Sequence, residues 1–437
     1  MIKTIKIGKK PRILRVKEGQ LMKRLIAVLM VLCLAVGMLA GCGSEGAGRG
    51  DAESVAPTPT PEPTPVPLNP NPLTGLEKAA DFHDGKAPVA VMVNNIKMSN
   101  GNDAFPQWGI GAADVIYEMV TEGGITRMMA VYSDYTKMPK VGPVRSARDQ
   151  HVQLMLPMGA LYVHEGASIF AARMLRTRAY PSGQLAADRD EDGTFDWGER
   201  DLYLGNPLGF SKGIVKWDQD RRNYRSQEMC AYTSGEQVMT AVENGADDSG
   251  EPDPLFNFVR YDEPARVPDG VAANDMHFQY SSSYYSDFTY DAATSRYLKG
   301  NTKGEPHIDG DTNEQLAFDN VLLLFTQVVP YSQLGYDAGM LVHVEYSWGG
   351  VGYYFTQGKM EPIRWMKGLP REPLRIVDAE GHEIDVEINC GKTYVGVTDN
   401  GMFDYCKLNG NSMNAEITGD APELEENAAD NVEAEDA

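Results

Sequence analysis

Two apolar runs separated by a pair of glycines predict a β-hairpin in the first half of the chain. The runs are Val115–Glu122 and Ile125–Val131, and Gly123-Gly124 suits the positive φ angles of a two-residue hairpin turn. With that turn, Val120 faces Arg127, and side chains alternate between the two faces of the sheet. The pattern therefore predicts that Arg127 shares a face with two carboxylates, Glu118 and Glu122. An exposed ladder of ion pairs is the alternative interpretation of these charges.

A helix and a buried strand are expected directly after this hairpin. Ser146, with Asp149 three residues later, fits a capping box that opens a helix running to about Leu156. The apolar run Leu161–Val163 predicts a short strand that ends in two polar residues. Polar groups just beyond the carboxyl end of a strand often form ligand sites in α/β proteins. This position makes ligand-binding candidates of His164 and Glu165.

Two arginines, Arg145 and Arg148, flank the predicted start of that helix. The first N–H groups of a helix have no intrahelical acceptor and already favour an anion, and arginine adds positive charge. Simple N-capping by Ser146 is the alternative role of this polar stretch. The sequence thus predicts one ligand-binding cleft formed by Glu118, Arg127, Arg145, Arg148, His164 and Glu165.

The character of the chain changes after residue 255. The segment Asn244–Leu255 is rich in Gly, Asp and Pro and predicts a domain boundary. Beyond it, short β-rich runs recur with turns between them, among them residues 321–328, 340–346 and 393–397. The expected fold class is therefore α+β, with a mixed α/β N-terminal domain over residues 84–244 and a β-rich C-terminal domain over residues 255–400.

The N-terminus has the pattern of a lipoprotein leader. Met22-Lys23-Arg24 begins a basic region, residues 25–38 are apolar, and Leu39-Ala40-Gly41-Cys42 looks like a bacterial lipobox. The apolar run is shorter than the roughly 20 residues of a membrane-spanning helix. We therefore expect a signal peptide over residues 1–41, with Met22 as an alternative start, and a lipid on Cys42. This anchor would hold the protein on the extracytoplasmic face of the cell membrane.

Removing the leader makes the chain strongly acidic. The net charge of the 437 residues is −22, and residues 1–41 carry nine Lys/Arg and one Glu, a net +8, which leaves −30. Such a charge argues against nucleic acid as a partner. The Pro- and Thr-rich composition after Cys42 predicts an extended tether over residues 42–83, and residues 415–437 predict an acidic disordered tail.

Cysteine usage is sparse in the rest of the chain. Cys230, Cys390 and Cys406 follow the lipobox, and an odd number cannot form a full disulfide framework. The spacing leaves a bridge between Cys390 and Cys406 open. No CxxC pair or His/Cys zinc pattern occurs in the sequence.

An acidic segment fits the twelve-residue calcium loop of an EF-hand. Residues 188–199 read DRDEDGTFDWGE, with acids at alternate positions, glycine at the sixth and glutamate at the twelfth. Calcium takes six to eight oxygen ligands, which a dense carboxylate loop can supply. A solvated acidic loop is the alternative. The sequence predicts a lone structural calcium site with the ligands Asp188, Asp190, Asp192, Thr194, Asp196 and Glu199.

Several of these segments together resemble the YerB-like family of bacterial lipoproteins. The resemblance lies in Pro88–Asn95, Ala113–Glu118, Glu122–Arg127 and Gly142–Asp149. The later motifs Asp319-Asn320-Val321 and Asn389–Val395 look like that family's second domain. The resemblance covers most of residues 84–400 and implies two domains, but it brings no set of catalytic residues.

The sequence favours a membrane-anchored lipoprotein of the bacterial cell envelope. Its expected partners are the membrane, through the N-terminal lipid, and an anionic or glycan cell-wall polymer or an envelope protein. The alternative is a cell-wall hydrolase in which Glu118, Glu165 and His164 supply the acid and the base. Carboxylates four residues apart on a strand lie ~13 Å apart, beyond the ~5–9.5 Å of such pairs, which counts against a Glu118–Glu122 pair, although either could act with Glu165. A purely structural interaction module is the third alternative.

Overall fold

The computed structural model describes residues 68–98, 100–179 and 214–413, with side chains up to residue 175 in the second range. The described residues belong to one compact unit. Among the described residues, no helix is long and apolar enough to cross a membrane. The signal peptide, the lipobox, the calcium loop and the acidic tail predicted above lie outside the described residues.

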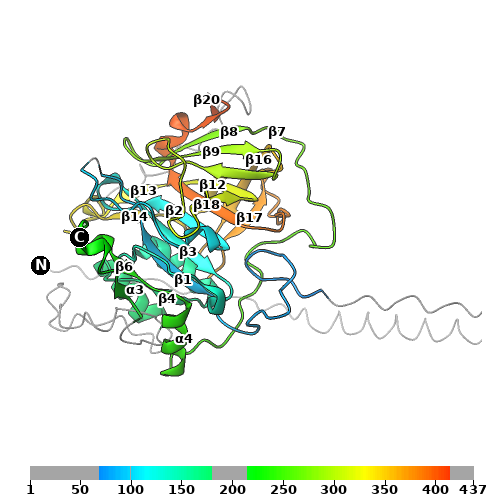
Figure 1. The fold of residues 1–437 in the computed structure, drawn as a ribbon. Helices are drawn as coiled ribbons and strands as arrows, with labels where there is room; N and C mark the ends of the chain where they lie inside the picture. Colours follow the sequence, from blue (N-terminus) through cyan, green and yellow to red (C-terminus); the bar gives the residue numbers. More distant parts are fainter. Residues whose placement is uncertain (1–67, 99, 180–213, 414–437) are drawn as a thin grey trace, which may run out of the picture. The chain divides into compact units, whose positions relative to one another are not determined.

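A ten-stranded sheet forms the centre of this unit (Figure 1). Nine strands follow one another in the order β17-β16-β15-β12-β18-β2-β3-β1-β4, and β7 (Val271–Ala272) pairs with β16. The nine are β1 (Val89–Asn94), β2 (Val115–Val120), β3 (Thr126–Tyr132), β4 (Leu161–Val163), β12 (Asn320–Thr326), β15 (Gly350–Thr356), β16 (Lys359–Met366), β17 (Arg375–Asp378) and β18 (Thr393–Asp399).

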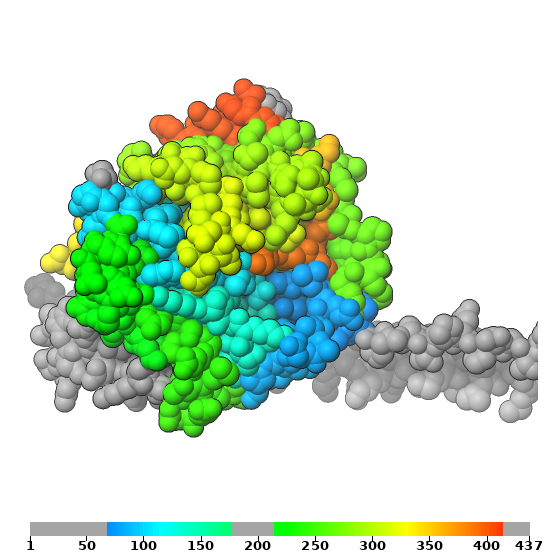
Figure 2. All heavy atoms as spheres, in the orientation of Figure 1, coloured from blue at the N-terminus to red at the C-terminus, as the bar shows by residue number. Residues whose placement is uncertain are grey.

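The two halves of the sequence meet in the middle of this sheet. Strand β18 runs parallel to β2, with Thr393 opposite Val115 and Val397 opposite Met119. The predicted boundary at Asn244–Leu255 therefore separates two segments of the sequence that share one sheet in space. Figure 2 shows segments from both halves adjoining on the surface.

Each face of the large sheet is covered by a different layer. A six-stranded sheet packs on one face through a core that includes Ile116, Met128 and Phe288. Helices α2 (Asp149–Met155) and α3 (Ile169–Ala179) pack on the other face. The strands of the six-stranded sheet are β8 (Asp275–Gln279), β9 (Tyr285–Asp291), β10 (Arg296–Lys299), β11 (Ala317–Phe318), β19 (Lys407–Leu408) and β20 (Asn411–Ser412).

The remaining elements are small. Two-stranded sheets are formed by β5 (Lys216–Trp217) with β6 (Ala231–Tyr232) and by β13 (Val328–Pro330) with β14 (Val342–Val344). A third helix, α4, spans Gly235–Glu243. The predicted α+β class is confirmed: helices α2, α3 and α4 all lie before residue 244, and the later part is mostly strand.

The folded unit extends beyond the predicted domain limits at both ends. Leu73 and Thr74 are buried, so the end of the predicted tether, from residue 68 to residue 83, belongs to the fold. Leu408 and Met413 are also buried, beyond the predicted end at residue 400. The described thiols form no disulfide, so the Cys390–Cys406 bridge that the spacing left open is not made.

Candidate functional site

The predicted hairpin exists, but its register is shifted by one residue. Strands β2 and β3 are joined by the five residues Thr121–Ile125, in which Gly123 and Gly124 both have the expected positive φ. Arg127 consequently pairs with Met119 rather than Val120. Because side chains alternate, a one-residue shift moves a side chain to the other face. The predicted common face of Glu118 and Arg127 is wrong: the two side chains point to opposite faces of the sheet.

Glu118 lies in the core between the two sheets and is not part of a cleft. Its carboxylate lies 3.2 Å from Lys299 Nζ, and both side chains are 1% exposed. Four further groups donate hydrogen bonds to this carboxylate, namely those of Asn95, Thr126, Ser286 and Tyr394. Glu118 is enclosed on the face opposite Arg127, so it cannot act together with Glu165 and His164 as the hydrolase alternative required.

Glu122, in the hairpin loop, holds two arginines on the helical side of the sheet. Its Oε1 accepts from Arg127 at 2.8 Å, and both of its oxygens accept from Arg148, at 2.8 and 2.6 Å. Arg127 also donates to the carbonyl of Ser146 at 2.8 Å. A bidentate arginine–carboxylate pair fixes both position and orientation. The loop is therefore fastened to the segment that precedes α2.

Charge and burial act strongly on this cluster. Burial raises the pKa of Glu122, but Arg127 and Arg148 together hold that pKa far below its usual range. Burial, and after it the positive charge of Arg148, lower the pKa of Arg127 to about 9, so Arg127 stays charged at neutral pH. The buried Nε–H groups of Arg127 and Arg145 have no acceptor among the described residues. Buried donors of this kind are normally satisfied, so these two groups are exceptions within the described part of the chain.

Helix α2 begins later than the capping box predicts. Arg148 is the N-cap residue and α2 starts at Asp149, so the predicted cap by Ser146 is wrong. Arg148 donates to Glu122 and to the Ala147 carbonyl, and it is therefore not a free cation at the helix start. Arg145 reaches the surface, where it pairs with Glu228 at 3.1 Å.

The carboxyl end of β4 lies beside this cluster, as the sequence predicts. Glu165 donates its N–H to the Arg145 carbonyl, and Ala147 pairs with Ala167 as a parallel bridge. The His164 ring is buried, and its Nδ1 lies 2.9 Å from the Gly166 carbonyl oxygen. Five of the six predicted site residues thus lie along two adjacent segments and β3, whereas Glu118 lies elsewhere.

A second group of polar side chains continues the cluster, and the sequence did not predict it. Asp149 accepts from the Tyr331 hydroxyl at 2.6 Å and lies 4.0 Å from His343 Nδ1, whose other nitrogen lies 3.5 Å from Glu345. The hydrogen bond to Asp149 raises the pKa of His343. These residues come from β14 and its flanks, about 180 positions away in the sequence, and no local pattern marks them.

Comparison with known proteins identifies the family. The model "Protein of unknown function (DUF3048) N-terminal domain" matches residues 73–204, and the corresponding C-terminal domain matches residues 276–395. The chain belongs to this family. The predicted YerB-like resemblance is confirmed, because a protein of Bacillus subtilis (strain 168) named "Putative lipoprotein YerB" is 27% identical over 299 residues, 67% of this chain and 77% of that protein.

A solved structure shows the same fold for this DUF3048 chain. The crystal structure of the YerB protein from Bacillus subtilis matches with a TM-score of 0.56 and 23% identity. The match covers 76% of this chain and 96% of that structure. Both parts of the family fold are therefore present in the described unit.

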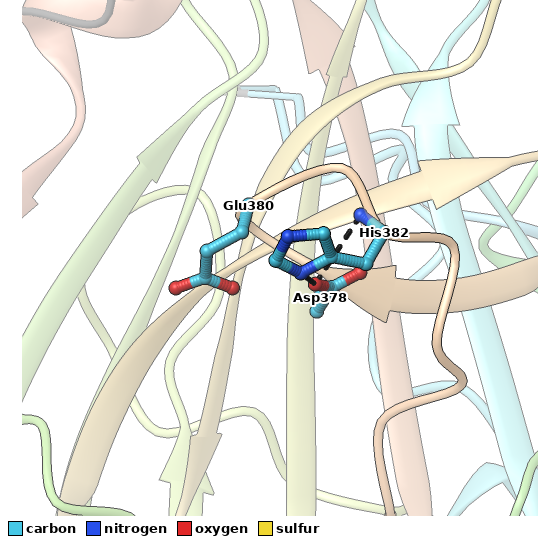
Figure 3. A group of neighbouring side chains, drawn as sticks. All are labelled: Asp378, Glu380 and His382. Atoms are coloured by element: carbon cyan, nitrogen blue, oxygen red, sulfur yellow. Dashed lines mark hydrogen bonds and ion pairs between the residues drawn. The ribbon is translucent and has the colours of Figure 1, made fainter.

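Two other features of the DUF3048 chain lie apart from the cluster. Asp378, Glu380 and His382 group on the turn after β17 (Figure 3), but Asp378 already accepts from the ring of His382 and from two backbone N–H groups of the turn. These bonds explain the grouping without an ion. A groove of about 490 Å³ near the edge strand β17 is lined mostly by apolar residues, including Phe256 and Phe258, and contains none of the predicted residues.

Proposed function

We propose that the protein is a lipoprotein anchored by Cys42 on the outer side of the cell membrane. The lipobox Leu39–Cys42 in the sequence supports the anchor, and the lipoprotein name of the Bacillus subtilis relative agrees with it. The acidic chain has no attraction of its own for anionic lipid. The covalent lipid is therefore the expected means of attachment.

The ligand site of this proposal is the polar cluster of Glu122, Arg127, Arg145 and Arg148, with Glu165 beside it. The observation that carries the proposal is the gathering of three arginines at one place, of which Arg145 keeps 27% of its side chain exposed beside Glu228. An acidic or hydroxyl oxygen of a ligand would accept from the exposed part of the Arg145 guanidinium group, and hydrogen bonds to charged groups contribute about 1.5–3 kcal/mol.

The acids of the cluster decide which ligands fit. Glu122 and Glu228 already pair with the arginines, so the cluster carries little excess positive charge. Dense polyanions need such an excess, whereas a polymer with hydroxyl groups and scattered acids can bond to carboxylates and guanidinium groups together. The cluster therefore suits a cell-wall glycan that bears acidic groups.

The proposal is tested by binding to peptide-free glycan strands of peptidoglycan. Arg145→Ala removes the part-exposed guanidinium group of the cluster and should lower the affinity by roughly tenfold or more in calorimetry. Arg260→Ala is the matched control, because Arg260 is also a surface arginine in an ion pair. Wild-type affinity in Arg145→Ala and in the double variant Arg145→Ala/Arg148→Ala, with both proteins folded, would contradict the proposal.

A further inference from the structure

The hairpin of β13 and β14 presents a group of exposed apolar side chains. Its tip, residues 331–341, begins with the 3-10 helix η8 (Tyr331–Leu334). Leu334 is 46% exposed, Tyr336 50% and Met340 69%. Single exposed apolar residues are ordinary, whereas exposed apolar side chains that form a patch are often part of an interaction site.

Aromatic packing holds this tip rigidly in place. Phe170, at the start of α3, stacks on Tyr331 with ring centroids 3.5 Å apart and an angle of 7°. Tyr336 lies edge-on to both rings, at 5.3 and 5.9 Å. Tyr336 therefore offers a fixed ring at the surface, and little side-chain entropy remains to be lost when a ligand binds.

The tip adjoins the polar cluster at two places. The Tyr331 hydroxyl donates to Asp149, the residue that follows Arg148. On the other side, Met340 lies against Gly123, where an added Cβ would come within 3.6 Å of the Met340 sulfur. Gly123 follows Glu122 in the hairpin loop. An exposed aromatic surface and an incompletely satisfied polar cluster thus lie next to each other.

We propose that the tip of this hairpin, through Tyr336 and Met340, is a platform on which sugar rings of the ligand stack. One face of a pyranose ring presents C–H groups that pack on an aromatic ring, while its hydroxyl and acidic groups point outward to polar partners. Three side chains are too few for a stable protein interface, which buries about 1,200–2,000 Å². This inference rests on the proposed function and narrows it, because the site then selects glycans over other polymers with the same acids.

Two probes that both carry carboxylates separate the stacking of sugar rings on the platform from the binding of acidic groups by the polar cluster. Peptide-free glycan strands of peptidoglycan carry carboxylates on sugar rings, and poly-L-glutamate carries carboxylates without sugars. Tyr336→Ala should weaken binding of the glycan strands roughly fivefold or more, whereas poly-L-glutamate, a dense polyanion, should bind the wild type weakly and the variant no more weakly. Met340→Ala should act in the same direction. Tyr405→Ala is the matched control, because Tyr405 is 60% exposed but lies in the 3-10 helix η9 (Asn400–Tyr405).

The outcomes distinguish the platform from the polar cluster. If Arg145→Ala weakens glycan binding and the Tyr336 and Met340 variants do not, the platform is refuted and the proposed function stands. If Tyr336→Ala weakens it and the arginine variants do not, the platform stands and the polar cluster is refuted. Equal affinity of the wild type for poly-L-glutamate and glycan strands, or no binding of the strands, also overturns the platform.

Discussion

Replacing Lys299 by Met tests whether the two sheets are held together by a buried ion pair. Lys299 extends from β10 in the six-stranded sheet, and Glu118 extends from β2 in the ten-stranded sheet. Burial lowers the pKa of Lys299, and Glu118 opposes that shift. Lys299→Met keeps an unbranched side chain but removes the charge, which leaves the Glu118 carboxylate buried without its cation.

The magnitude follows from what remains around Glu118. Removing one partner of a buried pair destabilises a protein by about 3–5 kcal/mol. Glu118 keeps four hydrogen-bond donors after the substitution, which stabilise its negative charge, so we expect a loss near the lower limit, about 3 kcal/mol. The double variant Glu118→Gln/Lys299→Met removes both charges. Its loss should be smaller than the sum of the single losses by about 1–3 kcal/mol.

Urea unfolding of the wild type, of Glu118→Gln, of Lys299→Met and of the double variant measures these losses in the free energy of unfolding. Lys303→Met, at an exposed position of the same region, is the control and should change the free energy of unfolding by less than about 0.5 kcal/mol. A loss below about 1 kcal/mol in Lys299→Met, or additive losses in the double variant, would refute the reasoning.

Three further predictions concern the anchor, the calcium loop and acid stability. Cys42→Ala should release the protein from membranes or leave it unprocessed, and normal retention with normal processing would contradict the anchor. Calcium, with a Kd on the order of 10⁻⁴–10⁻³ M, should raise the melting temperature, and Glu199→Gln should remove most of that rise; equal melting curves in calcium and chelator would favour the solvated loop. Because its two arginines hold the folded-state pKa of Glu122 below the unfolded value of 4.5, the stability that Glu122 contributes is present above that pH and lost as pH falls. Glu122→Gln should therefore lose less stability than the wild type on acidification, and parallel acid-unfolding profiles would contradict this.

The sequence predicts the elements of the first half better than their register. Apolar runs locate β2, β3 and β4, and Gly123-Gly124 locates the turn. The register depends on how many residues form the connection, and Thr121 and Ile125 join the loop through a backbone hydrogen bond from the N–H of Thr121. Composition does not reveal that bond. The register that this hydrogen bond sets has a large effect, because it places Arg127 on the opposite face of the sheet from Glu118.

The candidate site was predictable where its residues are close in sequence. The proximity of Glu122, Arg127 and Arg148 follows from a hairpin and the segment after it. The contact of Asp149 with Tyr331 joins positions 182 residues apart, and Lys299 is likewise distant from Glu118. Such pairs depend on how the later strands return to the first sheet, which the periodicity of a single chain does not specify.

The parallel pairing of β18 with β2 has a consequence for the folding of the newly synthesised chain. Until residues 393–399 have emerged, β2 is an open strand edge whose six side chains are destined for the interior. Such an edge invites pairing with another chain. Nearly the whole polypeptide must therefore be available before the first half can close its sheet, and a chain that stops at residue 244 should aggregate rather than persist as a domain. The interval between the appearance of these two strands is the time during which a chaperone is needed most.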